Sequence, residues 1–231
     1  MMIVSLPQHP KKVQALLSKL DDDRAALFQL HREGYAKPGA PIFPLDLLAM
    51  GAAKRAVSAN SAFKQMIEAW NLTSARTMLR THIDTGLRFS AAWLVDKPHD
   101  FATAVIAGER IDKMKDRDGK RLTDAHLVET RTEEYPWLPA VYKELSGYVH
   151  FSGSHVGASV DGLEKDDNLV SFLLSETDMK FPEFSWIEAI ECFREATGML
   201  AHFLEGYALT KQLTPAELEE GRQRFMSARA K

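Results

Sequence analysis

The sequence lacks several features that would point to a familiar class of protein. Cys192 is the only cysteine in 231 residues, so the chain can form neither an internal disulfide nor a thiolate zinc cluster. No window approaches the roughly 18 uninterrupted apolar residues of a membrane span. The first residues, MMIVSLPQHPKK, do not have the pattern of a signal peptide. We therefore expect a cytoplasmic chain without a membrane segment.

An excess of positive charge and the common catalytic signatures are missing too. The formal net charge is −3 and the pI is 6.3, which does not suit a protein that coats nucleic acid, although a local basic groove stays open. The chain has no glycine-rich phosphate-binding fingerprint, no nucleophile elbow and no paired zinc ligands on a helix. These absences exclude most nucleotide hydrolases and metallopeptidases, and no cofactor is expected.

Helical periodicity is what the sequence has in abundance. Apolar residues recur at intervals of three and four in nearly every segment, and 45% hydrophobic residues are enough for one sizeable core. We predict a single all-α domain over 1–231, a helical bundle with an N-terminal helix and loop at 1–44, a core at 45–210 and a peripheral charged helix at 211–231. Residues 151–182 are predicted to be rich in loops, because glycines, serines and acids occur there without a period.

A long helix is predicted in the C-terminal half of the chain. The tetrapeptide SWIE, which starts at Ser185, has the form of a capping box, so we expect the helix to begin there. Apolar stripes through Trp186 and through Cys192 give it two buried faces, which makes it the central helix. Cys192 is then most simply a small core residue.

The helical pattern between residues 45 and 95 is also strong, and the sequence does not place a boundary near Asn71. Arg76 lies on the apolar stripe of this region, and His82 is predicted to point away from it, at the surface. Arginines on a buried stripe need partners, because an unpaired buried guanidinium costs several kcal/mol.

A set of charged residues at intervals of four follows the same stripe. Asp84 stands four residues after Arg80 and four before Arg88, close enough to serve both. One interpretation is a structural ion pair that holds helices together. The other is an anion-binding face for phosphate or carboxylate, for which the planar fork of arginine is well suited.

The stretch VYKELSGYVHFSGSHV, residues 141–156, begins as an amphipathic helix and then breaks its pattern. Tyr142, Ser146 and His150 follow one another at intervals of four along the margin of the buried stripe. His150 could act as a general acid or base near neutral pH, or it could only satisfy carbonyls at the helix end. His155 is a second imidazole nearby, but no third ligand accompanies the pair, so no metal site is predicted.

Three segments in this order resemble a group of bacterial all-helical proteins whose activity is unassigned: LRTHIDTGLRF, GERIDKMKDRDGKRLTDAHL and VYKELSGYVHFSGSH. The resemblance covers roughly residues 71–155. More distantly, an arginine and an acid on one helix, followed by an LS-x-x-x-H pattern ending at His150, are similar to the HEPN-like helical proteins. Many of those bind nucleotides or cut RNA in defence systems. Their nuclease members carry an arginine and a histidine with four to six residues between them, a spacing matched here by Arg121 and His126.

The resemblance implies a helical bundle that binds a nucleotide or RNA phosphate, with His150 as the candidate catalytic residue for ribonuclease-type cleavage in a defence or stress context. The implied site is built from His150 together with the binding residues Arg80, Asp84, Arg88, Tyr142 and Ser146, and His155 is taken as a further binding residue. The alternative is a non-enzymatic helical interaction module that pairs with itself or with a partner. The sequence leaves catalysis, the ligand and a homodimeric state open.

Overall fold

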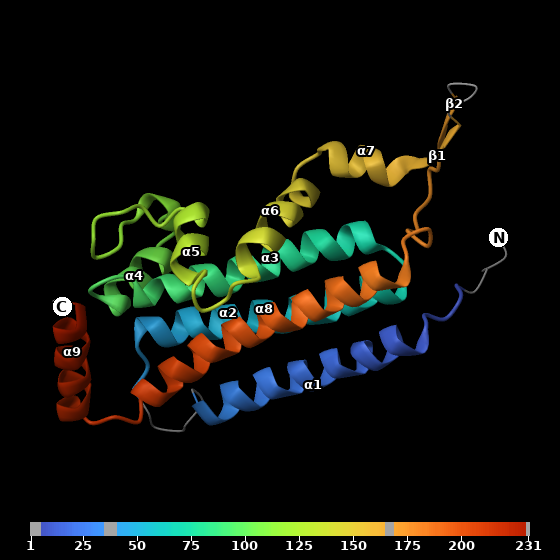
Figure 1. The fold of residues 1–231 in the computed structure, drawn as a ribbon. Helices are drawn as coiled ribbons and strands as arrows, with labels where there is room; N and C mark the ends of the chain where they lie inside the picture. The colour runs from blue at the N-terminus through green and yellow to red at the C-terminus, as the bar shows by residue number, and fades with distance from the viewer. Residues whose placement is uncertain (1–5, 35–40, 165–168, 230–231) are drawn as a thin grey trace.

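The computed structural model describes residues 6–34, 41–164 and 169–229 (Figure 1). Of the predicted N-terminal loop, residues 35–40 lie outside this description. Four long helices lie side by side as the body of the molecule: α1 (Lys11–Gly34), α2 (Pro44–Glu68), α3 (Leu72–Ser90) and α8 (Glu183–Thr210). The predicted all-α class and the long helix in the C-terminal half are both confirmed.

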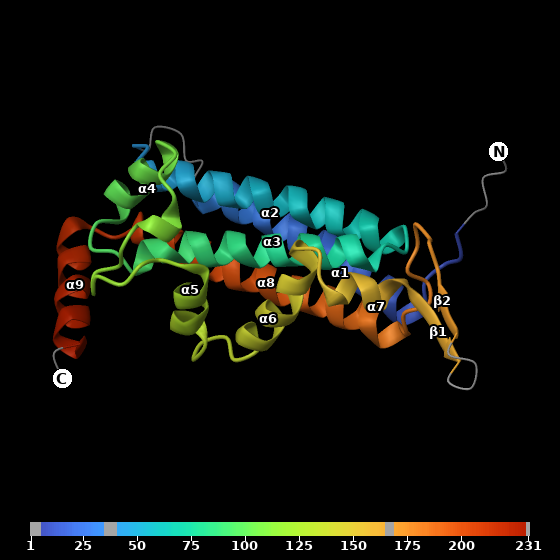
Figure 2. The same ribbon diagram turned by 90° about the horizontal axis from the view of Figure 1, so that it is seen from above.

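Shorter elements surround this body. They are the 3-10 turns η1 (Ala91–Trp93) and η2 (Ile111–Lys113) and the helices α4 (Pro98–Ile106), α5 (Asp124–Arg131), α6 (Leu138–Val149) and α9 (Pro215–Arg229). Helix α4 packs on α2, whereas α5 and α6 pack on α3. Seen from above, α9 stands across one end of the bundle (Figure 2).

The segment 151–182 contains, besides its loops, one short helix and one hairpin. Helix α7 (Gly153–Ser159) leads into the antiparallel strands β1 (Val160–Glu164) and β2 (Leu169–Phe172). We call residues 150–164 and 169–180 the arm. Its hairpin, formed by β1 and β2, projects beyond one end of the bundle (Figure 1).

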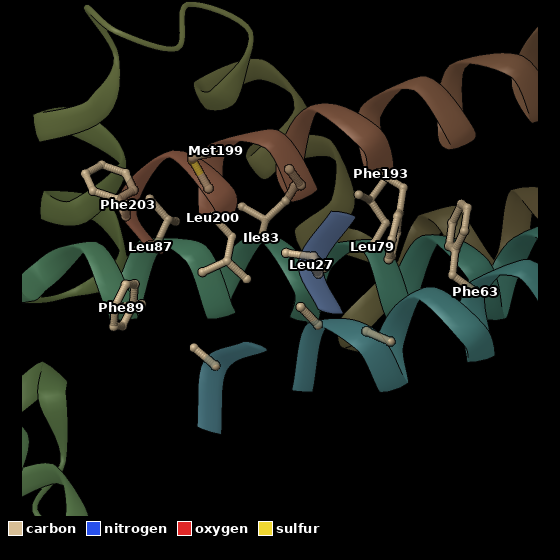
Figure 3. Close-up of a cluster of buried hydrophobic side chains, with 14 of the residues drawn as sticks. Leu27, Phe63, Leu79, Ile83, Leu87, Phe89, Phe193, Met199, Leu200 and Phe203 are labelled. Carbon is tan, nitrogen blue, oxygen red and sulfur yellow. The ribbon is translucent and has the colours of Figure 1, made fainter. Parts of the chain in front are cut away.

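The core lies between α3 and α8, with α1 and α2 completing it (Figure 3). The rings of Phe63 on α2 and Phe193 on α8 stack with their centroids 4.2 Å apart. At Gly86 the two central helices come close, because a Cβ there would lie 2.7 Å from the Cε of Met199. A larger residue at position 86 would therefore displace the end of the Met199 side chain.

Helices from opposite ends of the chain are fastened together in this core. Helix α1 packs on α8. The Arg194 guanidinium donates through Nε and Nη2 to the two oxygens of Asp23, at 2.7 and 3.0 Å. The amide of Asn60 on α2 donates to the carbonyl of Leu20 on α1 at 3.0 Å. The N-terminal helix is thus a full member of the bundle.

The boundary between α2 and α3, which the sequence did not place, lies at Trp70 and Asn71. Trp70 has φ = 57°, in the left-handed region that non-glycine residues rarely adopt. Its indole N–H donates to the Pro7 carbonyl at 2.8 Å, and its ring stacks on His9 at a centroid distance of 3.7 Å. The Asn71 side chain then caps α3 by accepting from the Ser74 N–H at 2.9 Å. Tertiary contacts thus hold a turn that local sequence alone does not favour.

Helix α8 begins at Glu183, three residues before the start that a Ser185 cap would give, and Ser185 is not its cap. The backbone N–H of Ser185 donates to the Pro182 carbonyl at 3.0 Å, inside the first turn. Pro182 occupies the N-cap position, because its restricted φ suits the entry to a helix and its missing N–H costs nothing there. The capping-box prediction at SWIE was therefore wrong.

Candidate functional site

A polar row runs along α3 where α6 crosses it. Arg80 is 8% exposed and forms an ion pair with Asp84, one turn further along the helix. From α6, the Tyr142 hydroxyl donates to Asp84 Oδ1 at 3.0 Å. The Arg80 guanidinium lies over the Tyr142 ring, 3.5 Å from its centroid. The structure therefore brings together three of the residues predicted from sequence.

The electrostatics of this cluster keep Tyr142 protonated. Burial raises the pKa of the Tyr142 phenol well above its usual value, and the Asp84 charge raises it further, while Arg80 opposes the shift. The phenol is therefore a permanent hydrogen-bond donor to Asp84. The ring also covers Arg80, whose Nε has no hydrogen-bond partner among the described residues. This guanidinium is largely enclosed, since the Arg80 side chain is only 9% exposed.

Arg88 does not share Asp84, contrary to the expectation from spacing. Its Nη2 donates to Asp124 Oδ1 at 2.9 Å, and Asp124 Oδ2 also lies 4.0 Å from Arg80 Nη2. Asp124 is the first residue of α5, placed there because Thr123 caps the helix by accepting from the His126 N–H. The acid that pairs with Arg88 thus comes from a different helix.

The remaining predicted residues are not gathered at this cluster. The Ser146 hydroxyl donates to the Tyr142 carbonyl at 2.8 Å, a bond within α6. His150 is the exposed C-cap of α6, about 12 Å along the helix axis from Tyr142 at 1.5 Å per residue. His155 lies in α7, where its Nδ1 accepts from the Ser152 N–H at 3.3 Å. The expected convergence of Arg80 with His150 therefore needs a ligand or a movement that bridges this gap.

A second arginine–tyrosine pair, which the sequence did not predict, holds the C-terminal end of α6 against α3. The Arg76 guanidinium donates to the Tyr148 hydroxyl and lies 4.9 Å from the centroid of that ring and 5.5 Å from that of Phe181. Thr77 Oγ1 donates to the Tyr148 carbonyl at 2.8 Å. Tyrosines at 142 and 148 stand six residues apart, a spacing that does not predict a shared partner helix. Together the two pairs make the α3–α6 contact a structural seam.

His82 was predicted to lie at the surface, and this prediction was wrong. The residue is 1% exposed, because α3 is covered by α6 on one side and by α8 and α2 on the other. Its ring stacks on Phe193 at 4.3 Å, and Nε2 lies 2.9 Å from Thr197 Oγ1. Since the Thr197 hydroxyl already donates to the Phe193 carbonyl, His82 Nε2 must donate to Thr197. Burial, aided by the Arg55 charge, lowers the pKa of His82 to about 3, so the ring is neutral.

The Arg121 and His126 pair, which matches the nuclease spacing, lies at a structured turn. His126 Nε2 is 2.7 Å from Asp116 Oδ2, while Asp116 Oδ1 accepts from the N–H groups of Asp118 and Lys120. Burial opposes ionisation of Asp116, but these hydrogen bonds outweigh it and lower its pKa. The arrangement organises the turn, in which Gly119 takes φ = 80°. His126 is thus already engaged within its own segment.

Other common site chemistries find little support in the part of the chain that the structure describes. No three His, Cys, Asp or Glu side chains gather there to hold a metal ion. No helix there is both long and apolar enough to cross a bilayer. Burial and the surrounding glutamates raise the pKa of the Cys192 thiol to about 11, so it stays protonated.

Comparison with known proteins found no matching family model, no matching curated protein and no matching solved structure.

Proposed function

We propose that this chain is a non-enzymatic helical interaction module that associates with itself through the arm. The observation that carries the proposal is the exposure of large apolar side chains there: 87% for Phe151, 66% for Phe172 and 102% for Leu174. Soluble proteins rarely leave such groups together in water unless they form an interaction surface.

The exposed side chains of the hairpin share a face. Val170, Phe172 and Leu174 alternate along β2 and its continuation, so they point to one side. The Leu173 N–H donates to the Ser159 carbonyl at 2.8 Å, which extends the pairing past the end of β2. A two-stranded hairpin is only marginally stable alone in water, and an apolar cover or a further strand stabilises it. The arm is built to receive such a cover.

A second copy of the chain is the partner that we propose. The apolar residues of the arm, counted over both faces of the hairpin, together expose on the order of 800 Å², the same order as the roughly 800 Å² that each partner contributes to a standard interface. These side chains are Phe151, Val156, Val170, Phe172, Leu173, Leu174 and Met179. In a two-fold pair the same patch meets itself, so an apolar face is self-complementary.

Charge on the arm gives this association a distinctive salt dependence. The residues of the arm carry four acids and one lysine, a net charge of −3. Two such arms repel each other at low ionic strength, and salt screens the repulsion. Self-association through the arm should therefore strengthen as salt is added.

Nucleotide or RNA binding at Arg80 and His150 stays a prediction, and two features weigh against it. A phosphate would have to displace the Tyr142 ring from Arg80, and Asp84 would compete with it for the guanidinium. Binding to nucleic acid weakens as salt rises, since it releases counterions. The direction in which binding changes with salt concentration therefore distinguishes self-association from nucleic-acid binding.

The test is sedimentation equilibrium at about 50 mM and about 500 mM KCl. We expect the wild-type chain to associate, more strongly at the higher salt. The double variant Phe172→Ser, Leu174→Ser should associate at least about tenfold more weakly. Phe28→Ser is the matched control, because Phe28 is 57% exposed on α1, outside the arm. Circular dichroism should show the same helix content for all three chains, since the replaced side chains are exposed.

Two outcomes would reject the module. One is a wild-type chain that stays monomeric to about 100 μM at both salt concentrations. The other is a double variant that associates as well as the wild type. A labelled RNA whose fluorescence anisotropy rises on adding the protein, less so at high salt, would favour the nucleic-acid function instead.

A further inference from the structure

A groove of about 480 Å³ opens between α2, α3 and α4, away from the arm. Its apolar lining comes from all three helices and from η2: Leu47, Leu48, Phe89, Val105, Ile106 and Ile111. Leu47 and Ile106 are 48% and 53% exposed, so part of this apolar lining is in contact with water. The volume and lining are typical of sites that bind small molecules.

One wall of the groove contains a glycine in the middle of a long helix. Leu47, Gly51 and Arg55 lie at intervals of four along α2 and all line the groove. Glycine lowers helix stability at such a position. Nothing lies within 4 Å of the point that a Cβ of Gly51 would occupy, so the residue is not required by close packing of the bundle. Its effect is to keep the wall of the groove open.

The charges around the groove leave an excess of one positive charge. Arg55 and Arg88 line it, together with Asp84. Asp84 is paired with Arg80, and Arg88 is paired with Asp124. Three guanidinium groups against two carboxylates leave one cation, 3 − 2 = 1. That cation is Arg55, which is exposed and has no hydrogen bond or ion pair with the described residues.

We infer that this groove binds a small molecule with an apolar body and an anionic head, a carboxylate or a phosphate. The apolar body would lie along Leu47, Gly51 and Ile106, and the head would meet Arg55, with Arg88 beside it. Arginine binds both kinds of oxyanion through its planar fork. The inference is independent of self-association through the arm, because it uses none of the arm residues.

The experiment uses two probes that share a tail and differ in the head, octanoate and octyl phosphate, titrated into the full chain by calorimetry. Acetate and octylamine are the controls, since the first lacks the tail and the second carries the wrong charge. We expect saturable binding of one or both anionic probes and none of the controls. The probe that binds with the higher affinity shows whether the head of the ligand is a carboxylate or a phosphate.

Two variants test the two halves of the groove, each with a matched control. Arg55→Gln should weaken binding by roughly tenfold or more, whereas Lys54→Gln, which removes the neighbouring exposed cation, should leave it within about twofold. Gly51→Leu should abolish binding, because the new side chain fills open space and does not disturb packing. Gly198→Leu places the same side chain at an exposed glycine of α8 that likewise has nothing within 4 Å, and should bind as the wild type does.

Thermal denaturation should show that Gly51→Leu is folded and melts no lower than the wild type, since leucine favours helix more than glycine does. Absence of saturable binding of both anionic probes to the wild-type chain would overturn the inference. Undiminished binding to a folded Gly51→Leu chain, or to Arg55→Gln, would overturn it as well.

Discussion

The guanidinium of Arg80 lies over the phenol ring of Tyr142 at the α3–α6 crossing, with Cζ 3.5 Å from the ring centroid. Both groups also contact Asp84, by an ion pair from Arg80 and a hydrogen bond from Tyr142. A cation, a ring and a carboxylate thus contact one another at this crossing. The contact joins two helices whose sequences lie about 60 residues apart.

Replacing Arg80 should therefore destabilise the fold. Arg80→Gln leaves Asp84 without its cation at a site where the carboxylate is 21% exposed, so we expect a loss of about 2 to 3 kcal/mol in the free energy of unfolding, below the full cost of a buried pair. Arg88→Gln is the control: Arg88 and Asp124 are 44% and 38% exposed, and their pair should contribute less than about 1 kcal/mol. Urea denaturation measures both. Equal losses for the two variants would show that Arg80 is not a structural residue.

Stability should fall in acid through His82. Its pKa is about 3 in the fold and about 6.5 in the unfolded chain, so between these values the unfolded state binds one more proton. The free energy of unfolding then decreases as pH falls below about 6.5, at up to about 1.4 kcal/mol per pH unit from this group. His82→Gln retains a donor for Thr197 and does not titrate, so its pH profile from 6 to 4 should be flatter than that of the wild type.

The control for this pH profile is His202→Gln, because the His202 side chain is 63% exposed. Its profile should follow that of the wild type. Parallel profiles for all three chains would mean that His82 takes up its proton in the folded state.

Asp178 should act as a remote cap that ties the arm to the bundle. Its Oδ2 accepts from the Thr73 N–H in the first turn of α3 at 2.8 Å, and its own N–H donates to the Trp70 carbonyl at 2.6 Å. Asp178→Ala should cost about 1 kcal/mol of stability, as expected for a lost N-cap, and should speed proteolysis within the arm. Asp161→Ala, at an exposed position of β1, should do neither. Unchanged cleavage in Asp178→Ala would mean that the base of the arm is held by other contacts.

The sequence was informative wherever local spacing determines geometry. Intervals of three and four identified the helices, and the interval of four placed Asp84 beside Arg80. The same reasoning failed where the partner is distant in sequence. His82 bonds to Thr197, 115 residues away, and its burial depends on α8 covering a face of α3 that spacing alone leaves to solvent. Periodicity reports which residues share a face, and it does not report which faces are covered.

Part of the candidate site could be predicted because it depends on spacing within one helix. Tyr142 was expected at the margin of its helix, and the structure places it against Asp84. The ion pair between Arg88 and Asp124 depends on how the chain returns to α3 after η2. No spacing in the sequence predicts that return. The hairpin of the arm was not predicted, because its strands are only five and four residues long and β1 is interrupted by a bulge between Val160 and Gly162.

The packing of α1 against α8 means that the bundle cannot be completed until late in synthesis of the chain. Asp23 and Arg194 are 171 residues apart, and α8 also covers the apolar face of α3. A ribosome that adds about 5 to 20 residues per second needs roughly 6 to 24 s to go from the end of α3 to the end of α8, a span of 120 residues. During that interval α8 is not there to cover its side of α3, on which Ile83 and Leu87 are buried in the finished fold. We predict that ribosome-bound chains halted before Glu183 are cleaved within α3 by a protease that spares the released full-length chain, and that nascent-chain chaperones bind there; protection of α3 in the halted chains would show that the first helices fold without α8.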